Sequence, residues 1–117
     1  MRAAIDTLGA QPAPRWLVIG DMKELGSDAA ELHRGVGAYA RECGIERFYA
    51  VGELSRHACA GYGAGAHHFE QQQDLIDALR AELVAGVTVL TKGSRSSAMD
   101  RVANALLSPA TGGSHAA

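Results

Sequence analysis

The sequence predicts an α/β protein with a three-layer, Rossmann-like fold, in which a mostly parallel sheet of about four to six strands is flanked by helices. Apolar segments with strand periodicity alternate along the chain with segments of helical periodicity. Helix-sized connections separate consecutive strands. Connections of this length are most simply explained by parallel strands with right-handed crossovers. The length of 117 residues suits one compact domain and is too short for two. We therefore expect one domain over residues 1–107.

The first part of the chain is predicted to form a helix followed by a strand. Met1 to Leu8 has helical periodicity, and Gly9 is a suitable C-terminal stop. Pro12 and Pro14 then interrupt the chain before the predicted strand at Arg15 to Ile19.

A helix that begins after Ser27 is the next predicted element. Ser27 can cap this helix, and Asp28 and Glu31 fall in its first turn, where carboxylates interact favourably with the helix dipole. Gly44 ends the helical pattern. The face that we expect to be buried consists of Leu32, Val36, Tyr39, Ala40 and Cys43.

The middle of the chain is predicted to form a strand, a helix and a weaker strand. The strand is Arg47 to Val51, and Gly52 then opens a helix from about Glu53 to Tyr62. The weaker strand is Ala66 to Phe69. The glycines between them follow a helix, whereas the dinucleotide-binding fingerprint follows a strand, so we interpret them as a linker: Gly61, Gly63 and Gly65.

The last part is predicted to form a helix, a strand and a second helix. The first helix is expected to bury Leu75, Ile76, Leu79 and Leu83. Gly86 precedes the strand at Val87 to Thr91, where β-branched residues dominate. The last helix should start near Ser96 or Ser97 and bury Met99, Val102, Ala103 and Leu106. Residues 108–117, rich in small and polar residues, are predicted to be a disordered tail.

Composition argues against several classes of partner. The formal net charge is −2 and lysines and arginines do not cluster, which disfavours nucleic acid. Apolar runs are too short to cross a membrane and the N-terminus does not resemble a signal peptide, so we expect a cytoplasmic protein that does not bind membranes. Cys43 and Cys59 are interpreted as small buried hydrophobes. The histidines lack the spacing of metal ligands, and the pair His67 and His68 would point to opposite faces of a strand.

Two charged loops that follow strands are the candidate functional sites. The first, Gly20 to Gly26, contains Asp21, Lys23 and Glu24 directly after a buried strand. Ligands of parallel sheets bind outside the carboxyl ends of the strands, where a carboxylate could meet a cation or an ammonium group. Asp21 is best placed because it follows the strand immediately. The alternative is a solvated turn whose charges face water.

The second loop contains Lys92, Gly93, Ser94 and Arg95. It is not a Walker phosphate loop, in which a longer glycine loop ends in Gly-Lys-Ser/Thr. A glycine, a hydroxyl and two cations near a helix N-terminus suit an anion, and Arg95 could bind a carboxylate through two donors. An ordinary strand-to-helix turn with a serine cap is the alternative.

Several motifs, taken together and in order, resemble the C-terminal domain of the Mur ligase family. The resemblance covers nearly everything from Met1 to Leu107. The matching segments are Met1–Ile5, Val18–Gly26, Leu32-His33 with Val36-Gly37, Ala50–Glu53, Val89–Arg95 and Met99–Val102.

This resemblance implies one domain of an ATP-dependent ligase that adds D-alanyl-D-alanine to UDP-N-acetylmuramoyl-tripeptide. In such enzymes ATP phosphorylates the peptide carboxylate, the dipeptide amine attacks the acyl phosphate, and phosphate leaves. The last domain closes over the central domain and helps to hold the amino-acid substrate, which orients it and excludes water. The resemblance further implies that ATP and Mg²⁺ bind mainly outside this chain, which has no catalytic residue or metal ligand of its own.

The resemblance also implies which residues line the substrate crevice. Arg95, aided by Ser94, would bind the dipeptide carboxylate, and Asp21 or Glu24 would face its ammonium group. Gly52, Lys92 and Gly93 would line the rest of the substrate crevice. Because the UDP-sugar and central domains are missing and the first helix lacks a cap, we expect a monomeric, inactive piece of a longer chain. Two other hypotheses stay open: a free-standing binding module for a nucleotide or phosphorylated metabolite, and an interaction domain without a ligand.

Overall fold

A single parallel sheet forms the centre of the computed structural model, which describes residues 2–84, 86–93 and 99–107. Within these residues the strand order is β3-β2-β1-β4. The strands are β1 (Arg15–Gly20), β2 (Arg47–Val51), β3 (Ala66–Phe69) and β4 (Thr88–Lys92). The helices are α1 (Arg2–Gly9), the 3₁₀ helix η1 (Lys23–Asp28), α2 (Ala29–Glu42), α3 (Ser55–Tyr62), α4 (Gln72–Glu82) and α5 (Met99–Leu107).

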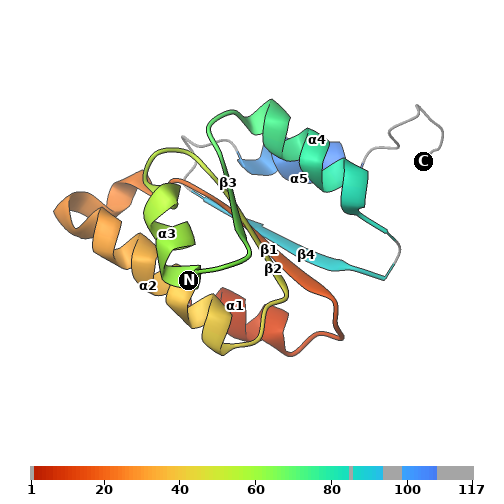
Figure 1. Ribbon diagram of the computed structural model, residues 1–117, viewed down its shortest axis with the longest axis horizontal. Helices are drawn as coiled ribbons and strands as arrows, with labels where there is room; N and C mark the ends of the chain where they lie inside the picture. Colours follow the sequence, from red (N-terminus) through yellow and green to blue (C-terminus); the bar gives the residue numbers. More distant parts are fainter. Residues whose placement is uncertain (1, 85, 94–98, 108–117) are drawn as a thin grey trace.

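Helices cover both faces of the sheet, so the predicted three-layer α/β fold is confirmed. Figure 1 shows α4 and α5 on one face and α1, α2 and α3 on the other. Alternate residues of β1 supply the two apolar cores: Leu17 and Ile19 pack on the side of α1–α3, whereas Trp16 and Val18 pack on the side of α4 and α5. Because both faces are buried, the central strands are apolar at nearly every position.

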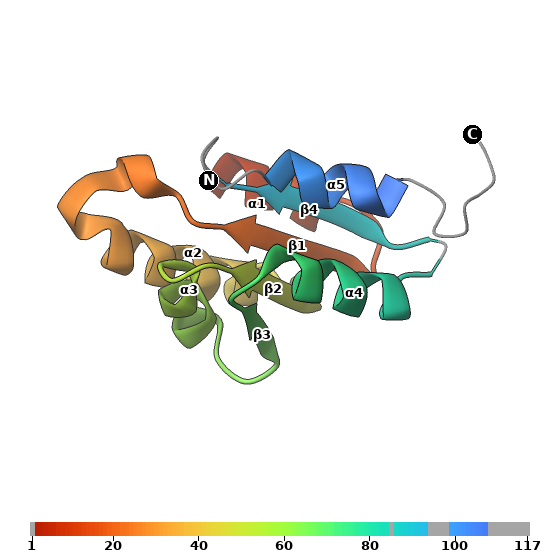
Figure 2. The same ribbon diagram turned by 90° about the horizontal axis from the view of Figure 1, so that it is seen from above.

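The strand order places a reversal beside β1. The chain passes from β1 to β2 and then to β3 in one direction, and α4 carries it back across the sheet to β4 on the other side of β1 (Figure 2). In open parallel sheets, ligands bind at such a reversal because the loops after the two strands diverge there. The loops after β1 and β4 are the two that the sequence singled out.

Helices α2 and α3 pack so closely that glycine is required at their contact. A Cβ atom on Gly37 would lie 1.9 Å from the carbonyl oxygen of Ala58, and one on Gly61 would lie 2.0 Å from that of Arg34. The interpretation of Gly61 as part of a linker was therefore wrong: it lies inside α3. Gly63 and Gly65 do form the following turn, with positive φ angles.

The start and the buried face of α2 differ from the prediction. The helix begins at Ala29 after η1, so Ser27 is not its cap. The backbone N–H of Ala29 instead donates to the carbonyl of Gly26. Leu32 was expected in the core but is 47% exposed. The contact with α3 at Gly37 has no room even for a Cβ atom. The buried positions of α2 are Ala29, His33, Gly37 and Ala40.

Other element boundaries shift slightly. Helix α3 starts at Ser55, two residues after the predicted Glu53, and β4 runs one residue later than predicted. The predicted start of the last helix at Ser96 or Ser97 and the predicted tail at 108–117 lie outside the described residues. No helix in the described part of the chain is long and apolar enough to cross a membrane.

The two cysteines are half-buried free thiols that pack against the core on the side of α1–α3. Burial raises the pKa of the Cys59 thiol to about 11, because the apolar surroundings disfavour the thiolate. Both observations fit the interpretation of these residues as small hydrophobes.

We expect Gly37→Ala to destabilise the domain by about 2–3 kcal/mol, because its methyl group has no space against α3. The matched control is Gly35→Ala in the same helix, where a Cβ would meet nothing within 4 Å. That change should stabilise the domain by about 0.5–1 kcal/mol. Urea unfolding of both variants tests the helix contact, and equal effects would contradict it.

We expect the Cys59 thiol to be alkylated slowly near neutral pH. Its pKa rises from 9.0 to about 11. The reactive thiolate is therefore about a hundredfold scarcer at pH 8, and the rate should keep rising with pH up to about 11. Iodoacetamide labelling of a Cys43→Ala variant, followed against pH, measures this residue alone. A rate that levels off near pH 9 would refute the effect of burial.

Candidate functional site

The turns that follow β1, β2 and β4 meet at one edge of the sheet. Gly20 pairs in register with Val51 on one side, and Ile19 pairs with Lys92 on the other. Asp21, Gly52 and Gly93, which directly follow these strands, therefore lie at nearly the same level. Figure 2 shows the ends of the four parallel strands from above. Ser94 and Arg95 lie outside the described residues, and for Glu24 only the backbone is described.

Asp21 is buried between the first two of these turns. Its side chain is only 7% exposed, and its Oδ1 accepts hydrogen bonds from the backbone N–H (2.8 Å) and the hydroxyl (2.9 Å) of Ser55. Ser55 is the first residue of α3 and is fully buried. A carboxylate from the end of another strand thus satisfies an N–H at the start of this helix, as a local capping residue would.

Gly52 allows this approach. Its φ angle is +113°, and a Cβ there would lie 2.4 Å from Asp21 Oδ1. The same residue is fixed from the β3 side. Its N–H donates to the carbonyl of Phe69 at 3.0 Å, and its carbonyl lies 2.7 Å from Nε2 of His68, which donates to it. Side chains from β1 and β3 therefore hold the turn after β2 from both sides.

His33 fixes the start of the loop after β1. The ring is completely buried in α2. Its Nε2 accepts the backbone N–H of Met22 at 3.1 Å, and its Nδ1 lies 2.6 Å from the carbonyl of Ala29. Only the neutral tautomer with the proton on Nδ1 satisfies both partners. Sequence reasoning considered this histidine only as a possible metal ligand and missed its structural role. The available signal was its place in α2 on the same face as the small residues Gly37 and Ala40.

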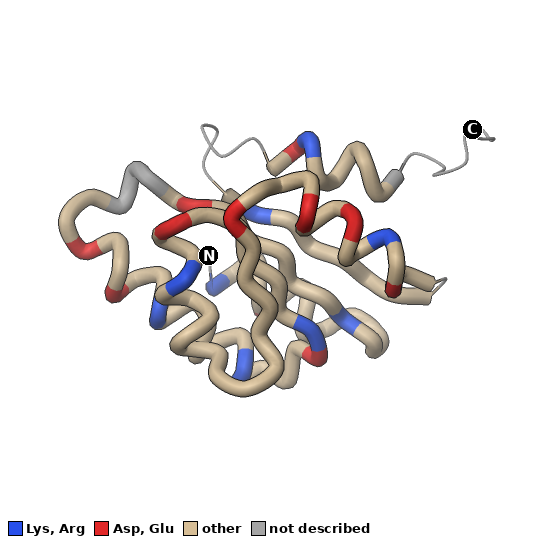
Figure 3. Tube along the Cα trace, turned by 45° about the horizontal axis from the view of Figure 1, so that its top comes forward, with Lys and Arg blue, Asp and Glu red and all other residues tan. Residues whose placement is uncertain are grey.

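A polar hollow of about 490 Å³ opens beside these turns. Arg101 of α5 lines it and donates to the side-chain oxygens of Gln72 (2.9 Å) and Gln73 (3.3 Å). Figure 3 shows acidic positions gathered at this end of the sheet, in the turns after β1, β2 and β3. Carboxylates and a guanidinium in one hollow suit a ligand that carries charges of both signs. The lining residues are Asp21, Val51, Gly52, Glu70, Gln71, Gln72, Gln73 and Arg101.

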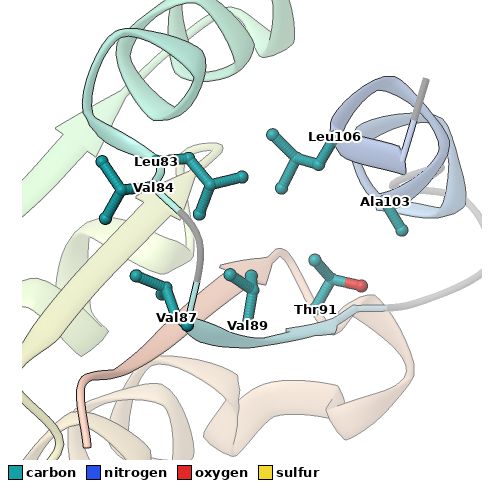
Figure 4. A pocket seen from close by; sticks show the side chains of 8 residues that line it. Leu83, Val84, Val87, Val89, Thr91, Ala103 and Leu106 are labelled. Atoms are coloured by element: carbon teal, nitrogen blue, oxygen red, sulfur yellow. The ribbon is translucent and has the colours of Figure 1, made fainter. Parts of the chain in front are cut away.

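Two further hollows flank the edge strand β4 and are apolar. One, of about 400 Å³, lies between β4, α5 and the end of α4 (Figure 4). Its side chains are those of Leu83, Val84, Val87, Val89, Thr91, Ala103 and Leu106. The other, of about 410 Å³, lies between β4 and α1. The first hollow has no charged side chain in its lining, whereas the second includes that of Lys92 together with the polar residues Thr7, Gln11 and Thr88.

The described structure thus brings together the predicted residues Asp21 and Gly52, with Lys92 and Gly93 on the adjacent strand end. Lys92 is exposed. Among the described residues, no three histidine, cysteine, aspartate or glutamate side chains are grouped so that they could hold a metal ion.

Comparisons with known proteins agree on one family. A family model described as "Mur ligase, glutamate ligase domain" matches residues 1–95. The UDP-N-acetylmuramoyl-tripeptide–D-alanyl-D-alanine ligase of Escherichia coli is 40% identical over 108 residues, which are 91% of this chain and 24% of that protein. The chain therefore spans about a quarter of this relative.

Solved structures show the same fold. A crystal structure of MurF from Acinetobacter baumannii superposes with a TM-score of 0.80 at 28% identity, covering 93% of this chain and 25% of that one. MurF ligase from Thermotoga maritima in complex with ADP gives a TM-score of 0.74 at 22% identity, covering 87% and 23%.

We expect His33→Ala to destabilise the domain by about 2–4 kcal/mol, since it leaves a cavity and two buried backbone groups without partners. Hydrogen exchange should also accelerate at the Met22 amide, which loses its acceptor. His57→Ala, at a half-buried position of α3, is the control. An unchanged Met22 exchange rate would show that the imidazole does not hold this loop.

Proposed function

The chain belongs to the Mur ligase family, and on that premise we propose that it is the substrate-closing domain of an ATP-dependent peptide ligase. The proposed reaction joins D-alanyl-D-alanine to UDP-N-acetylmuramoyl-tripeptide in peptidoglycan precursor synthesis. The observation that carries the proposal is the 40% identity to the Escherichia coli ligase of that name across 91% of this chain. The bound ADP of the Thermotoga maritima protein supports ATP as the co-substrate.

The proposed role of this chain is to hold the dipeptide against the activated carboxylate. An acyl phosphate is open to hydrolysis, so an amide-forming enzyme gains from orienting the amine and excluding water. We assign this task to the edge of the sheet where Asp21, Gly52 and Gly93 leave their strands. The parallel register supports this assignment, because it brings the three turns to one level.

Charge complementarity suggests how the dipeptide lies. Its carboxylate would meet the loop of Lys92 to Arg95, with Arg95 and Ser94 as donors. Its ammonium group would lie toward the acidic turns, which contain Asp21 and Glu24. The polar hollow next to Asp21 and Gly52 supports a charged ligand at this edge.

The rest of the reaction belongs to regions beyond this chain, which spans about a quarter of its relatives. We propose that ATP, Mg²⁺ and the UDP-sugar bind mainly there. We propose a cytoplasmic enzyme, because ATP and nucleotide-linked precursors are cytoplasmic metabolites. We also propose that it acts as a monomer.

An assay of the longer protein that contains this chain tests the function. ATP-dependent joining of the dipeptide to the UDP-linked tripeptide is expected, with release of ADP and phosphate. The isolated chain should be inactive and should bind ATP poorly in calorimetry. Micromolar ATP affinity of the isolated chain would instead favour the free-standing nucleotide-binding module.

We expect Arg95→Ala in the longer enzyme to lower kcat/KM for the dipeptide. The loss should correspond to about 1.5–3 kcal/mol of transition-state stabilisation, since one charged hydrogen bond would be lost. Arg34→Ala is the matched control, because this exposed guanidinium approaches only Glu31, at 3.8 Å, among the described side chains. An unchanged KM and kcat for Arg95→Ala would refute the assignment.

A further inference from the structure

We propose that Asp21 is a positioning residue: it acts by holding the turn Gly52–Ser55 in place and does not pair with the ammonium group of the substrate. This inference rests on the proposed function and changes the role of one residue within it. The carboxylate follows a strand at the binding edge, so contact with a ligand is the obvious interpretation of the sequence. The contacts of the Asp21 side chain indicate a structural role instead.

The hydrogen bonds of Asp21 are already made inside the protein. Oδ1 accepts two donors from Ser55, at 2.8 and 2.9 Å, and the residue is only 7% exposed. Turning the carboxylate toward a ligand would break both bonds. The N–H and hydroxyl of Ser55, which is completely buried, would then lose the acceptor they share. A carboxylate that must stay in place to accept the hydrogen bonds of Ser55 is poorly suited to bind a substrate as well.

The turn held by Asp21 is fixed at both of its ends, Gly52 and Ser55. Gly52 lies directly against the carboxylate, with no room for a Cβ atom. Its N–H and carbonyl are bonded to Phe69 and His68 of β3. The exposed side chain in this turn is that of Glu53, which is presented at the same edge as the turns after β1 and β4. Asp21 therefore sets where this turn meets the crevice.

Substitution by asparagine separates the two roles. The side-chain oxygen of Asn can accept the same two hydrogen bonds from Ser55, whereas its amide cannot attract an ammonium group as a carboxylate does. Positioning predicts that Asp21→Asn keeps function and that Asp21→Ala loses it. Ligand contact predicts that both fail equally. Ser55→Ala offers an independent approach, because it removes the hydroxyl donor without altering the carboxylate.

Dipeptide kinetics of the longer enzyme provide the first measurement. We expect Asp21→Asn to stay within about threefold of the unmutated KM, and Asp21→Ala to raise KM about tenfold or more, with kcat changing less. The double variant Asp21→Ala with Ser55→Ala should be no worse than Asp21→Ala alone, because both changes break the same contact. Asp28→Asn, which removes an exposed carboxylate without a capping hydrogen bond, should have no effect.

Hydrogen exchange of the Ser55 amide in the 117-residue chain provides the second measurement and does not depend on any activity. Protection should persist in Asp21→Asn and disappear in Asp21→Ala. A large, equal rise in KM for both Asp21 variants, with Ser55 still protected in Asp21→Asn, would overturn the proposal. Loss of that protection in Asp21→Asn would overturn it too. If the unmutated longer protein shows no ligase activity, the proposed function fails, and the exchange result still decides whether Asp21 holds the turn.

Discussion

The proposed binding edge of this domain depends on one buried contact, the hydrogen bonds from Ser55 to the carboxylate of Asp21. The contact joins the loop after β1 to the start of α3, and it forms only because Gly52 has no side chain. An unpaired carboxylate at this depth would be costly, as would an unpaired N–H at the start of a helix. Each group satisfies the other, so two turns from different parts of the sequence are fixed relative to each other.

The remaining polar contacts extend this arrangement. His33 holds the backbone of Met22 from α2, and His68 holds the carbonyl of Gly52 from β3. The glycine contacts between α2 and α3 keep the two helices that follow these turns close together. In the proposed role, a domain that closes over an active site must carry its substrate contacts as a preorganised unit, since small displacements of a reacting group reduce rates severely. Buried polar side chains provide that rigidity here, beneath turns that are themselves at the surface.

The fold could be predicted from the sequence because it depends on local patterns. The apolar runs at Arg15–Ile19 and Arg47–Val51 identified both central strands, and the helices between them required parallel pairing. The polar residues after the strands led to the proposed binding edge, and the register of the sheet brings the turns after β1, β2 and β4 to one level. Side-chain roles could not be obtained this way. Leu32 and His33 are adjacent in one helix, and only the tertiary packing of this helix decides that the histidine is buried, with its ring bonded to Met22, and the leucine exposed. The burial of Asp21 likewise depends on a partner 34 residues away.

The most direct test of this account is a crystal structure of the longer protein that contains this chain, with D-alanyl-D-alanine and a non-hydrolysable ATP analogue. The account predicts that the dipeptide lies against the turn after β2 and the loop after β4, with Asp21 still bonded to Ser55. A dipeptide that contacts only other domains, or that occupies an apolar hollow beside β4, would contradict it.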